Sequence, residues 1–187
     1  MLTELRFHSR GGQGGVVAGK LLAVACFLEG KDVQTFPTFG VERRGAPVMT
    51  FVRISDHKIR LRNQVYEPDH IVILDPSLIA HFDVTQGLKE GGIILVNTEK
   101  DVAEFNFPDT FRPFAINATH IAVVNKLGSL AQPIVNTAII GALAKITGLA
   151  SLDSVVEAVK ETVPIKIEAN AQAAIDAYNA IPDAALI

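Results

Sequence analysis

The pattern of apolar and polar positions at the start of the chain predicts a strand, a turn, a helix and a second strand. Glu4–Ser9 alternates polar and apolar side chains, the period typical of a strand. The glycine-rich turn Arg10–Gly15 follows, and apolar residues recur at helical spacing over Val17–Leu28 before a stop at Gly30. Val33–Phe36 reads as a short strand. This order is typical of α/β folds with parallel strands.

Four further apolar or alternating runs predict strands in the middle of the chain. They are Val48–Ile54, His70–Leu74, Ile93–Val96 and Phe114–Asn117. A polar turn at 55–58 predicts that Ile59–Leu61 returns as a hairpin partner of the first of these runs. Residues 99–113 lack periodicity and are expected to form a loop.

Helical patterns dominate the C-terminal third. Residues 138–146 are apolar nearly all round, as in a buried helix. Residues 152–163 form an amphipathic stripe between a cap at Ser151 and a stop at Pro164, and 167–178 form another. We therefore expect one α/β domain over residues 1–187: three layers, a largely parallel or mixed sheet, a Rossmann-like start and a helical C-terminal third.

Composition narrows the class of protein. Of 187 residues, 49% are hydrophobic and 20% charged, which excludes intrinsic disorder. The longest apolar run, 138–144, is too short to span a membrane, and charges occupy the place of a signal peptide's apolar core. A cytoplasmic protein without a membrane partner is expected. The single cysteine, Cys26, is expected to be a small buried side chain, and alone it cannot form an internal disulfide, a zinc site or an iron–sulfur cluster.

Charge is distributed unevenly along the chain. Residues 1–65 hold ten Lys and Arg against five Asp and Glu, whereas 66–187 hold seven against fifteen. The first third either faces an anion, such as a phosphorylated ligand or an acidic partner, or carries uneven solvated charge. No basic run is interleaved with aromatic residues, so nucleic acid is not an expected partner.

The glycine turn is the sharpest local feature. Gly11, Gly12, Gln13 and Gly14 follow a strand and open a helix, where backbone N–H groups and the helix dipole favour an anion or a partner's backbone. The alternative is a tight strand–helix turn without a ligand. In a dinucleotide fingerprint, glycine would stand where this chain has Ser9, and the second strand would end in an acid that is missing here. NAD is therefore not expected.

Two other polar groups carry candidate chemistry. Glu42, Arg43 and Arg44 lie in a loop bounded by glycine and proline, where they either contact a ligand or partner or form an internal pair that rigidifies the loop. Asp69 and Asp75 bracket a predicted strand, and turn chemistry explains them better than acid–base catalysis. The sequence predicts no catalytic residue and no metal site in this chain.

Four segments in this order resemble one family. They are the strand–SRGGQGG–helix start, FPTFGVERRGAPV at Phe36–Val48, YEPDHIVILDPSL at Tyr66–Leu78 and GGIILVNT at Gly91–Thr98. Together they are similar to the gamma subunit of 2-oxoacid:ferredoxin oxidoreductases, in particular the pyruvate and 2-oxoisovalerate enzymes, and to one domain of the single-chain pyruvate enzymes. The resemblance covers residues 4 to about 145.

The resemblance implies a subunit of an enzyme that decarboxylates a 2-oxoacid oxidatively, passes the acyl group to coenzyme A and sends electrons to ferredoxin. It implies alpha, beta and delta subunits as partners, which hold thiamine diphosphate and the iron–sulfur clusters, with no cofactor bound by this chain alone. An isolated chain is then expected to be inactive. As a hypothesis, Gly11–Gly14 and the Glu42–Arg44 loop face coenzyme A or a subunit interface.

Two alternatives remain open at this point. One is the corresponding chain of an indolepyruvate or 2-oxoglutarate enzyme. The other is a stand-alone nucleotide-binding protein with a degenerate Rossmann turn.

Overall fold

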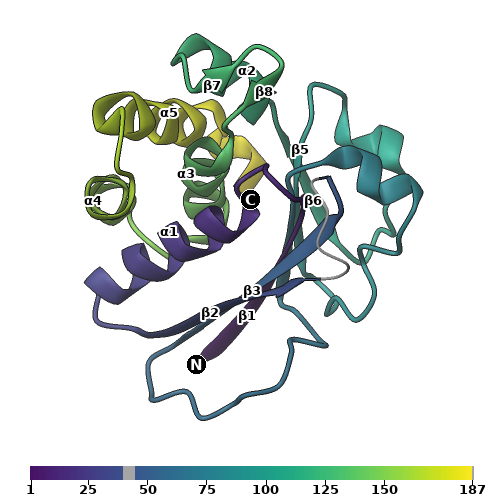
Figure 1. The fold of residues 1–187 in the computed structure, drawn as a ribbon. Helices are drawn as coiled ribbons and strands as arrows, with labels where there is room; N and C mark the ends of the chain where they lie inside the picture. Colours follow the sequence, from purple (N-terminus) through teal and green to yellow (C-terminus); the bar gives the residue numbers. More distant parts are fainter. Residues whose placement is uncertain (40–44, 187) are drawn as a thin grey trace.

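A computed structural model describes residues 1–39 and 45–186, which form a mixed six-stranded sheet with helices (Figure 1). The strands are β1 (Leu2–Arg10), β2 (Asp32–Phe39), β3 (Pro47–Ser55), β4 (His70–Ile73), β5 (Ile93–Asn97) and β6 (Arg112–Ile116). Their order across the sheet is β2-β3-β1-β4-β5-β6. β3 is antiparallel to both of its neighbours, whereas β1, β4, β5 and β6 pair in parallel. The expected mixed sheet is confirmed.

Five α-helices and several short elements complete the described fold. The helices are α1 (Gly15–Leu28), α2 (Ala118–Val124), α3 (Asn136–Thr147), α4 (Leu152–Thr162) and α5 (Ile167–Ala180). Short 3-10 turns are η1 (Pro76–Ala80), η2 (Val102–Phe105) and η3 (Asp183–Leu186), and β7 (Gly128–Ser129) pairs with β8 (Gln132–Pro133) as a separate hairpin. None of the helices described is long and apolar enough to cross a membrane.

The handedness of the connections sets the layers. The crossover β1–α1–β2 runs toward one side of the sheet, and β4–η1–β5–η2–β6 runs toward the other. Because parallel crossovers are right-handed, opposite directions place their connections on opposite faces. The helices cover one face, and η1 and η2 with their loops cover the other (Figure 1). The expected three layers are present, and the third consists of 3-10 turns and loops.

Alternate residues of the central strands fill two cores. In β4 and just after it, Val72 and Leu74 belong to the core under the helices, and Ile71 and Ile73 to the smaller core under η1 and η2. A strand buried on both faces needs apolar residues at every position, which explains the uninterrupted run in the sequence. The buried helix expected at 138–146 is α3, at the centre of the larger core.

One expectation about strand pairing needs correction, and one strand is inserted where the sequence did not indicate it. The strand–helix–strand start does form, but β3 lies between β1 and β2, so these two do not pair directly. The hairpin expected at Ile59–Leu61 is wrong, because β1 and β2 already occupy both edges of β3. Ile59 instead donates its backbone N–H to the Asp32 carboxylate at 2.7 Å, which anchors the loop that leads to β4.

Local capping explains which helices the sequence predicted. The Ser151 hydroxyl accepts the N–H of Ser154 at 3.1 Å and begins α4, as expected. The loop expected at 99–113 contains the short turn η2, and its last two residues already belong to β6. α2 was not predicted, because its seven residues give too short a pattern. It begins at Asn117, whose side chain accepts the N–H of His120 at 2.8 Å.

Candidate functional site

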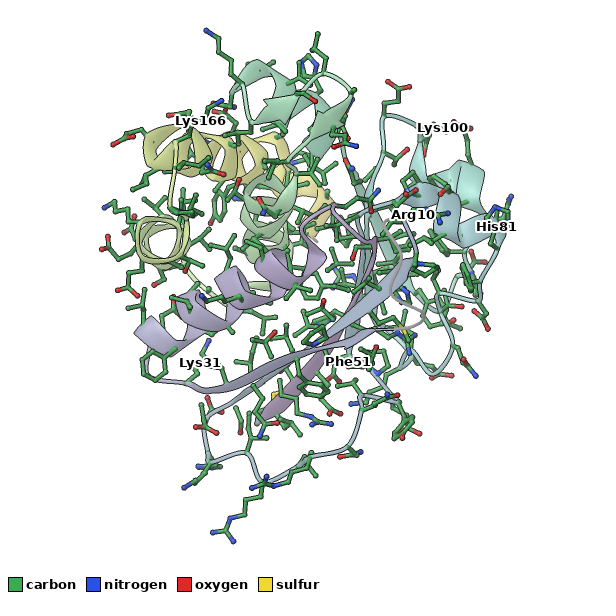
Figure 2. All side chains as sticks on the ribbon, viewed as in Figure 1. Arg10, Lys31, Phe51, His81, Lys100 and Lys166 are labelled. Atoms are coloured by element: carbon green, nitrogen blue, oxygen red, sulfur yellow. The ribbon has the colours of Figure 1, made fainter. Side chains whose placement is uncertain are left out.

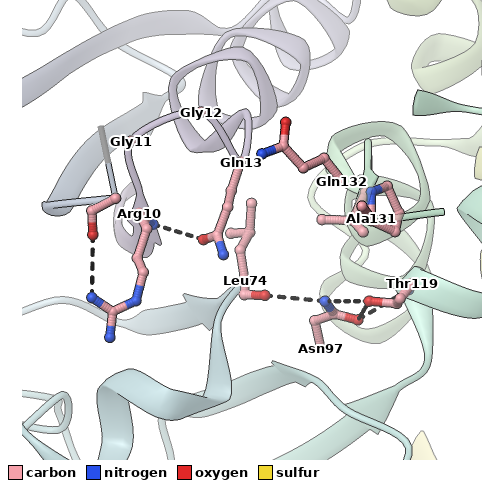
Figure 3. Close-up of a pocket in the computed structure, with 12 residues that line it drawn as sticks. Arg10, Gly11, Gly12, Gln13, Leu74, Asn97, Thr119, Ala131 and Gln132 are labelled. Atoms are coloured by element: carbon pink, nitrogen blue, oxygen red, sulfur yellow. Dashed lines mark hydrogen bonds between the residues drawn. The ribbon is translucent and has the colours of Figure 1, made fainter. Parts of the chain in front are cut away.

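The carboxyl ends of β1, β4 and β5 meet at one edge of the sheet, because these three strands are parallel. Between β1 and β4 the direction of the connections reverses, and open α/β sheets bind ligands at such a switch point. A cavity of about 400 Å³ lies there. Figure 3 shows the glycine turn on one side of it and Asn97, Thr119 and Gln132 on the other.

The glycine turn forms the first wall. Gly12 and Gly14 have φ values of +95° and +83°, which side chains with a Cβ rarely adopt. A Cβ on Gly12 would meet nothing within 4 Å, so this backbone is open to a ligand, whereas one on Gly14 would lie 3.0 Å from the Asn136 side chain. Gly14 caps α1, so the positive end of that helix dipole lies beside the cavity.

A carboxylate holds the turn in place. Asp75 accepts hydrogen bonds from Gln13 Nε2 at 2.8 Å and Arg10 Nε at 3.0 Å, and its other oxygen accepts the N–H of Ser77 at 2.9 Å. Gln13 Oε1 in turn accepts the N–H of Arg10 at 2.7 Å (Figure 3). We call Arg10, Gln13, Asp75 and Ser77 the Asp75 clasp. It ties the end of β1 to the start of η1.

The electrostatics of the clasp keep Asp75 ionised. Burial by itself raises the pKa of this carboxyl group, but hydrogen bonds from Ser77 and Gln13 and the charge of Arg10 outweigh it, so the pKa lies below its ordinary value. Arg10 also donates to the Ser77 hydroxyl at 3.0 Å and to the Gly45 carbonyl at 3.2 Å. Figure 2 labels Arg10 in the upper right part of the view, and its hydrogen bond to Ser77 ties it to η1. Its charge is therefore largely satisfied within the chain.

Amide and hydroxyl groups form the opposite wall. Asn97, the last residue of β5, donates to the Leu74 carbonyl at 3.0 Å and to the Thr119 hydroxyl at 3.1 Å (Figure 3). Its side-chain oxygen accepts the N–H of Thr119 at 3.2 Å, which joins β5 to α2. The hairpin residues Gln132 and Pro133 complete this side. The same Asn97–Thr119 pair borders a second hollow that reaches Lys100.

The predicted site residues are distributed as follows. Gly11, Gly12 and Gln13 line the cavity and Gly14 caps the adjacent helix. Glu42, Arg43 and Arg44 lie outside the described residues. Ser9 does not line the cavity. Its side chain is buried beside Gly15, so close that a Cβ on Gly15 would lie 2.2 Å from the Ser9 hydroxyl oxygen.

Sequence reasoning missed the other walls of the cavity. Asp75 was interpreted as turn chemistry; it does cap η1, but it also holds the glycine turn. Asn97 and Thr119 were not singled out at all. One available signal was position, because Asp75 and Asn97 each end or follow a buried parallel strand, and such strands end at the same edge.

The described residues contain no group of three or more His, Cys, Asp or Glu side chains that could hold a metal ion. Cys26 is buried in α1, as expected, and desolvation raises the pKa of its thiol to about 12. It is a packing residue at neutral pH. The donor set therefore does not fit an iron–sulfur cluster held by this chain.

The chain is therefore an α/β protein with a polar, glycine-lined cavity at the switch point of its sheet, where the parallel strands end. Residues 4–180 match the family model described as pyruvate ferredoxin/flavodoxin oxidoreductase. The chain is 54% identical over 182 residues to the pyruvate/ketoisovalerate oxidoreductases common subunit gamma of Thermococcus kodakarensis, covering 95% of this chain and 96% of that one. It is 51% identical to pyruvate synthase subunit PorC of Methanothermobacter marburgensis, with the same coverage.

The solved structures agree with these relatives. The crystal structure of pyruvate oxidoreductase subunit PORC from Thermotoga maritima superposes with a TM-score of 0.80 and 34% identity, covering 95% of this chain and 96% of that one. The chain belongs to the pyruvate ferredoxin/flavodoxin oxidoreductase family, as a gamma-type subunit of the oxidoreductase. The resemblance drawn from the four sequence segments is confirmed. A 2-oxoglutarate:ferredoxin oxidoreductase from Magnetococcus marinus shares the fold, with a TM-score of 0.75 at 21% identity over 97% of this chain and 32% of that chain.

Proposed function

We propose that residues 1–187 act as one gamma-type unit of a cytoplasmic complex with alpha, beta and delta subunits that oxidises pyruvate or a related 2-oxoacid. Acyl-coenzyme A and carbon dioxide are the products, and ferredoxin takes the electrons. The relatives named for pyruvate and ketoisovalerate support this substrate class over indolepyruvate or 2-oxoglutarate. Every relative reported above is an oxidoreductase or a subunit of one, which favours this role over a stand-alone nucleotide-binding protein.

The role of this chain in the complex is recognition and assembly. Thiamine diphosphate and the iron–sulfur clusters supply the carbon–carbon cleavage and electron transfer, and we place both on the partner subunits. The chain's own residues bind and orient. The observation that carries this proposal is the cavity at the switch point, where the glycine backbone is open and the N-terminus of α1 favours an anion.

Coenzyme A and an acidic partner surface are the two occupants that fit this edge. Both present anions, phosphate in one case and carboxylate in the other, and arginine recognises either in a bidentate manner. Arg43 and Arg44 are close in sequence to Gly45, which lines the cavity. We propose that these arginines and Gly11–Gly14 contribute to the same contact.

The test is the double variant Arg43→Ala with Arg44→Ala, made in the assembled enzyme. We expect either a KM for coenzyme A raised at least tenfold or a clear loss of assembled complex, because two cationic contacts are removed. A raised KM with intact assembly identifies coenzyme A as the occupant. Lost assembly identifies the partner surface.

The matched control is Arg60→Ala with Arg62→Ala. Both arginines are exposed and follow β3 at the opposite edge of the sheet, so KM and assembly should stay within twofold of the parent. If the Arg43/Arg44 variant also leaves both quantities unchanged, the proposed contact is wrong.

A further inference from the structure

A second cavity, also of about 400 Å³, lies on the sheet face opposite α1. Its lining includes Arg6, His8, Met49, Leu78, Phe82 and Asp83, and we call it the Arg6 pocket. It shares no lining residue with the cavity at the switch point. Apolar side chains form much of its wall, and the chemistry of its polar groups decides what it can bind.

Arg6 is the main charged group in this wall, and it is only 7% exposed. Its Nε donates to His8 Nε2 at 3.1 Å, and its Nη2 donates to the carbonyls of Val84 and Gln86 at 3.0 and 2.6 Å. No carboxylate among the described residues lies within 4.0 Å of the guanidinium. Neutral acceptors thus orient Arg6, while its charge has no ion-pair partner in this part of the chain.

Arg53, on the neighbouring strand β3, shows how the same chain satisfies a buried arginine. Its side chain is 1% exposed, and its Nε donates to the Glu4 carboxylate at 2.7 Å. It also lies over the Phe36 ring, 5.5 Å from the centroid. Buried charges are ordinarily paired, because an unpaired one loses its hydration without compensation. Within residues 1–39 and 45–186, Arg6 departs from this rule, and a cavity adjoins it.

Among the described residues, the titratable groups near Arg6 form no ion pair with it. His8 accepts a hydrogen bond from Arg6, and desolvation followed by the charge of Arg6 lowers the pKa of His8 to about 3, so it is neutral. Asp83 is exposed at the rim, where its carboxylate accepts the N–H and the hydroxyl of Thr85 at 3.1 and 2.7 Å. It attracts Arg6 from a distance without forming an ion pair.

We propose that the Arg6 pocket binds a carboxylate carried on a short aliphatic group. The guanidinium matches a carboxylate in charge, and its Nη1 is the nitrogen that donates no hydrogen bond to the described residues. Leu78 and Phe82 provide the apolar surface for the attached carbons. A volume of about 400 Å³ falls within the range of small-molecule sites.

This carboxylate has two possible sources, a free organic acid or an Asp or Glu side chain of a partner subunit. The chemistry at Arg6 is the same in both cases. The sources differ in when the pocket is open, since a partner's side chain fills it only in the assembled complex. The second source rests on the proposed function, and the first does not.

The first arm of the test titrates the full free chain with butanoate, followed by NMR of the Arg6 Nε–H. Saturable binding is expected, whereas butanamide, which has the same shape without charge, should bind at least tenfold more weakly. If butanoate does not saturate, or butanamide binds equally well, the proposal is overturned. Such a failure would leave the proposed assembly role intact.

Two substitutions at Met49 make this result specific. Met49 lies opposite His8 across the β1–β3 pair and diagonal to Arg6, within reach of a long side chain. Met49→Glu should place a carboxylate near Arg6 and weaken butanoate binding at least tenfold, and the uncharged Met49→Gln should stay within threefold. Equal affinity in both variants contradicts the site. Met49 is already 38% exposed, so neither substitution disrupts a core.

The second arm repeats the titration on the assembled complex. Binding that persists identifies a free acid as the ligand, and binding that is blocked identifies a partner's carboxylate. Either result supports the carboxylate site once the free chain has bound butanoate.

Discussion

Gly141→Ala will lower the free energy of unfolding by about 3 kcal/mol, although alanine is the better helix former by about 1 kcal/mol. Gly141 lies in the middle of α3, where that helix crosses α5. A Cβ at this position would lie 2.0 Å from the carbonyl oxygen of Ala174 and 2.8 Å from its Cα. Backbone cannot rotate away as a side chain does, so the two helices must separate. Urea unfolding of the isolated chain measures the loss.

Gly19→Ala is the matched control for this prediction. Gly19 is also a buried helical glycine, but its Cβ would meet side-chain atoms, at 2.7 Å from Thr50 and 3.2 Å from Val52. Side chains can adjust, so we expect a smaller loss, about 1 kcal/mol. If Gly141→Ala is as stable as the parent, the close crossing of α3 and α5 is incorrect.

Acidification will destabilise the chain through His8. Burial, and then the charge of Arg6, lower the pKa of this imidazole to about 3 in the folded chain, whereas an unfolded histidine titrates near its ordinary value of 6.5. Between these two pKa values the unfolded chain binds a proton that the folded chain does not. The contribution is therefore complete well above pH 6.5 and is lost as the pH falls, by about 2 kcal/mol between pH 6.5 and pH 4.5.

The measurement is the urea-unfolding free energy at several pH values, for the parent and for His8→Gln. Because other groups also titrate, the informative quantity is the difference in slope, about 1.4 kcal/mol per pH unit for one proton. Parallel slopes for the parent and His8→Gln would show that His8 is not held neutral.

Much of the fold was predictable because it is encoded locally. The alternation at Glu4–Ser9, the glycine turn and the cap at Ser151 each gave the correct element. The place of β3 between β1 and β2 was not predictable, because the choice of partner edge depends on the whole sheet. The expected return strand Ile59–Leu61 failed for the same reason.

The candidate site was predictable only on the side of the glycine turn. Gly11, Gly12 and Gln13 could be recognised in the sequence, because they form a glycine-rich run between a predicted strand and a predicted helix. Asn97 and Thr119 could not, because their place at the cavity depends on the parallel pairing of the strands. The structure also changes the interpretation of the charged first third of the chain. Arg10 and Arg53 form ion pairs inside the chain, so the excess of arginine there partly serves the fold.

The central claim is that this chain works as a subunit whose glycine-lined edge faces a ligand or partner. Native mass spectrometry of the chain, affinity-purified from its own cells under anaerobic conditions, tests it most directly. We expect it to copurify with chains that contain thiamine diphosphate and iron, and a panel of 2-oxoacids would then identify the substrate. A chain recovered alone and carrying a nucleotide would contradict the subunit role and make the glycine turn a nucleotide site.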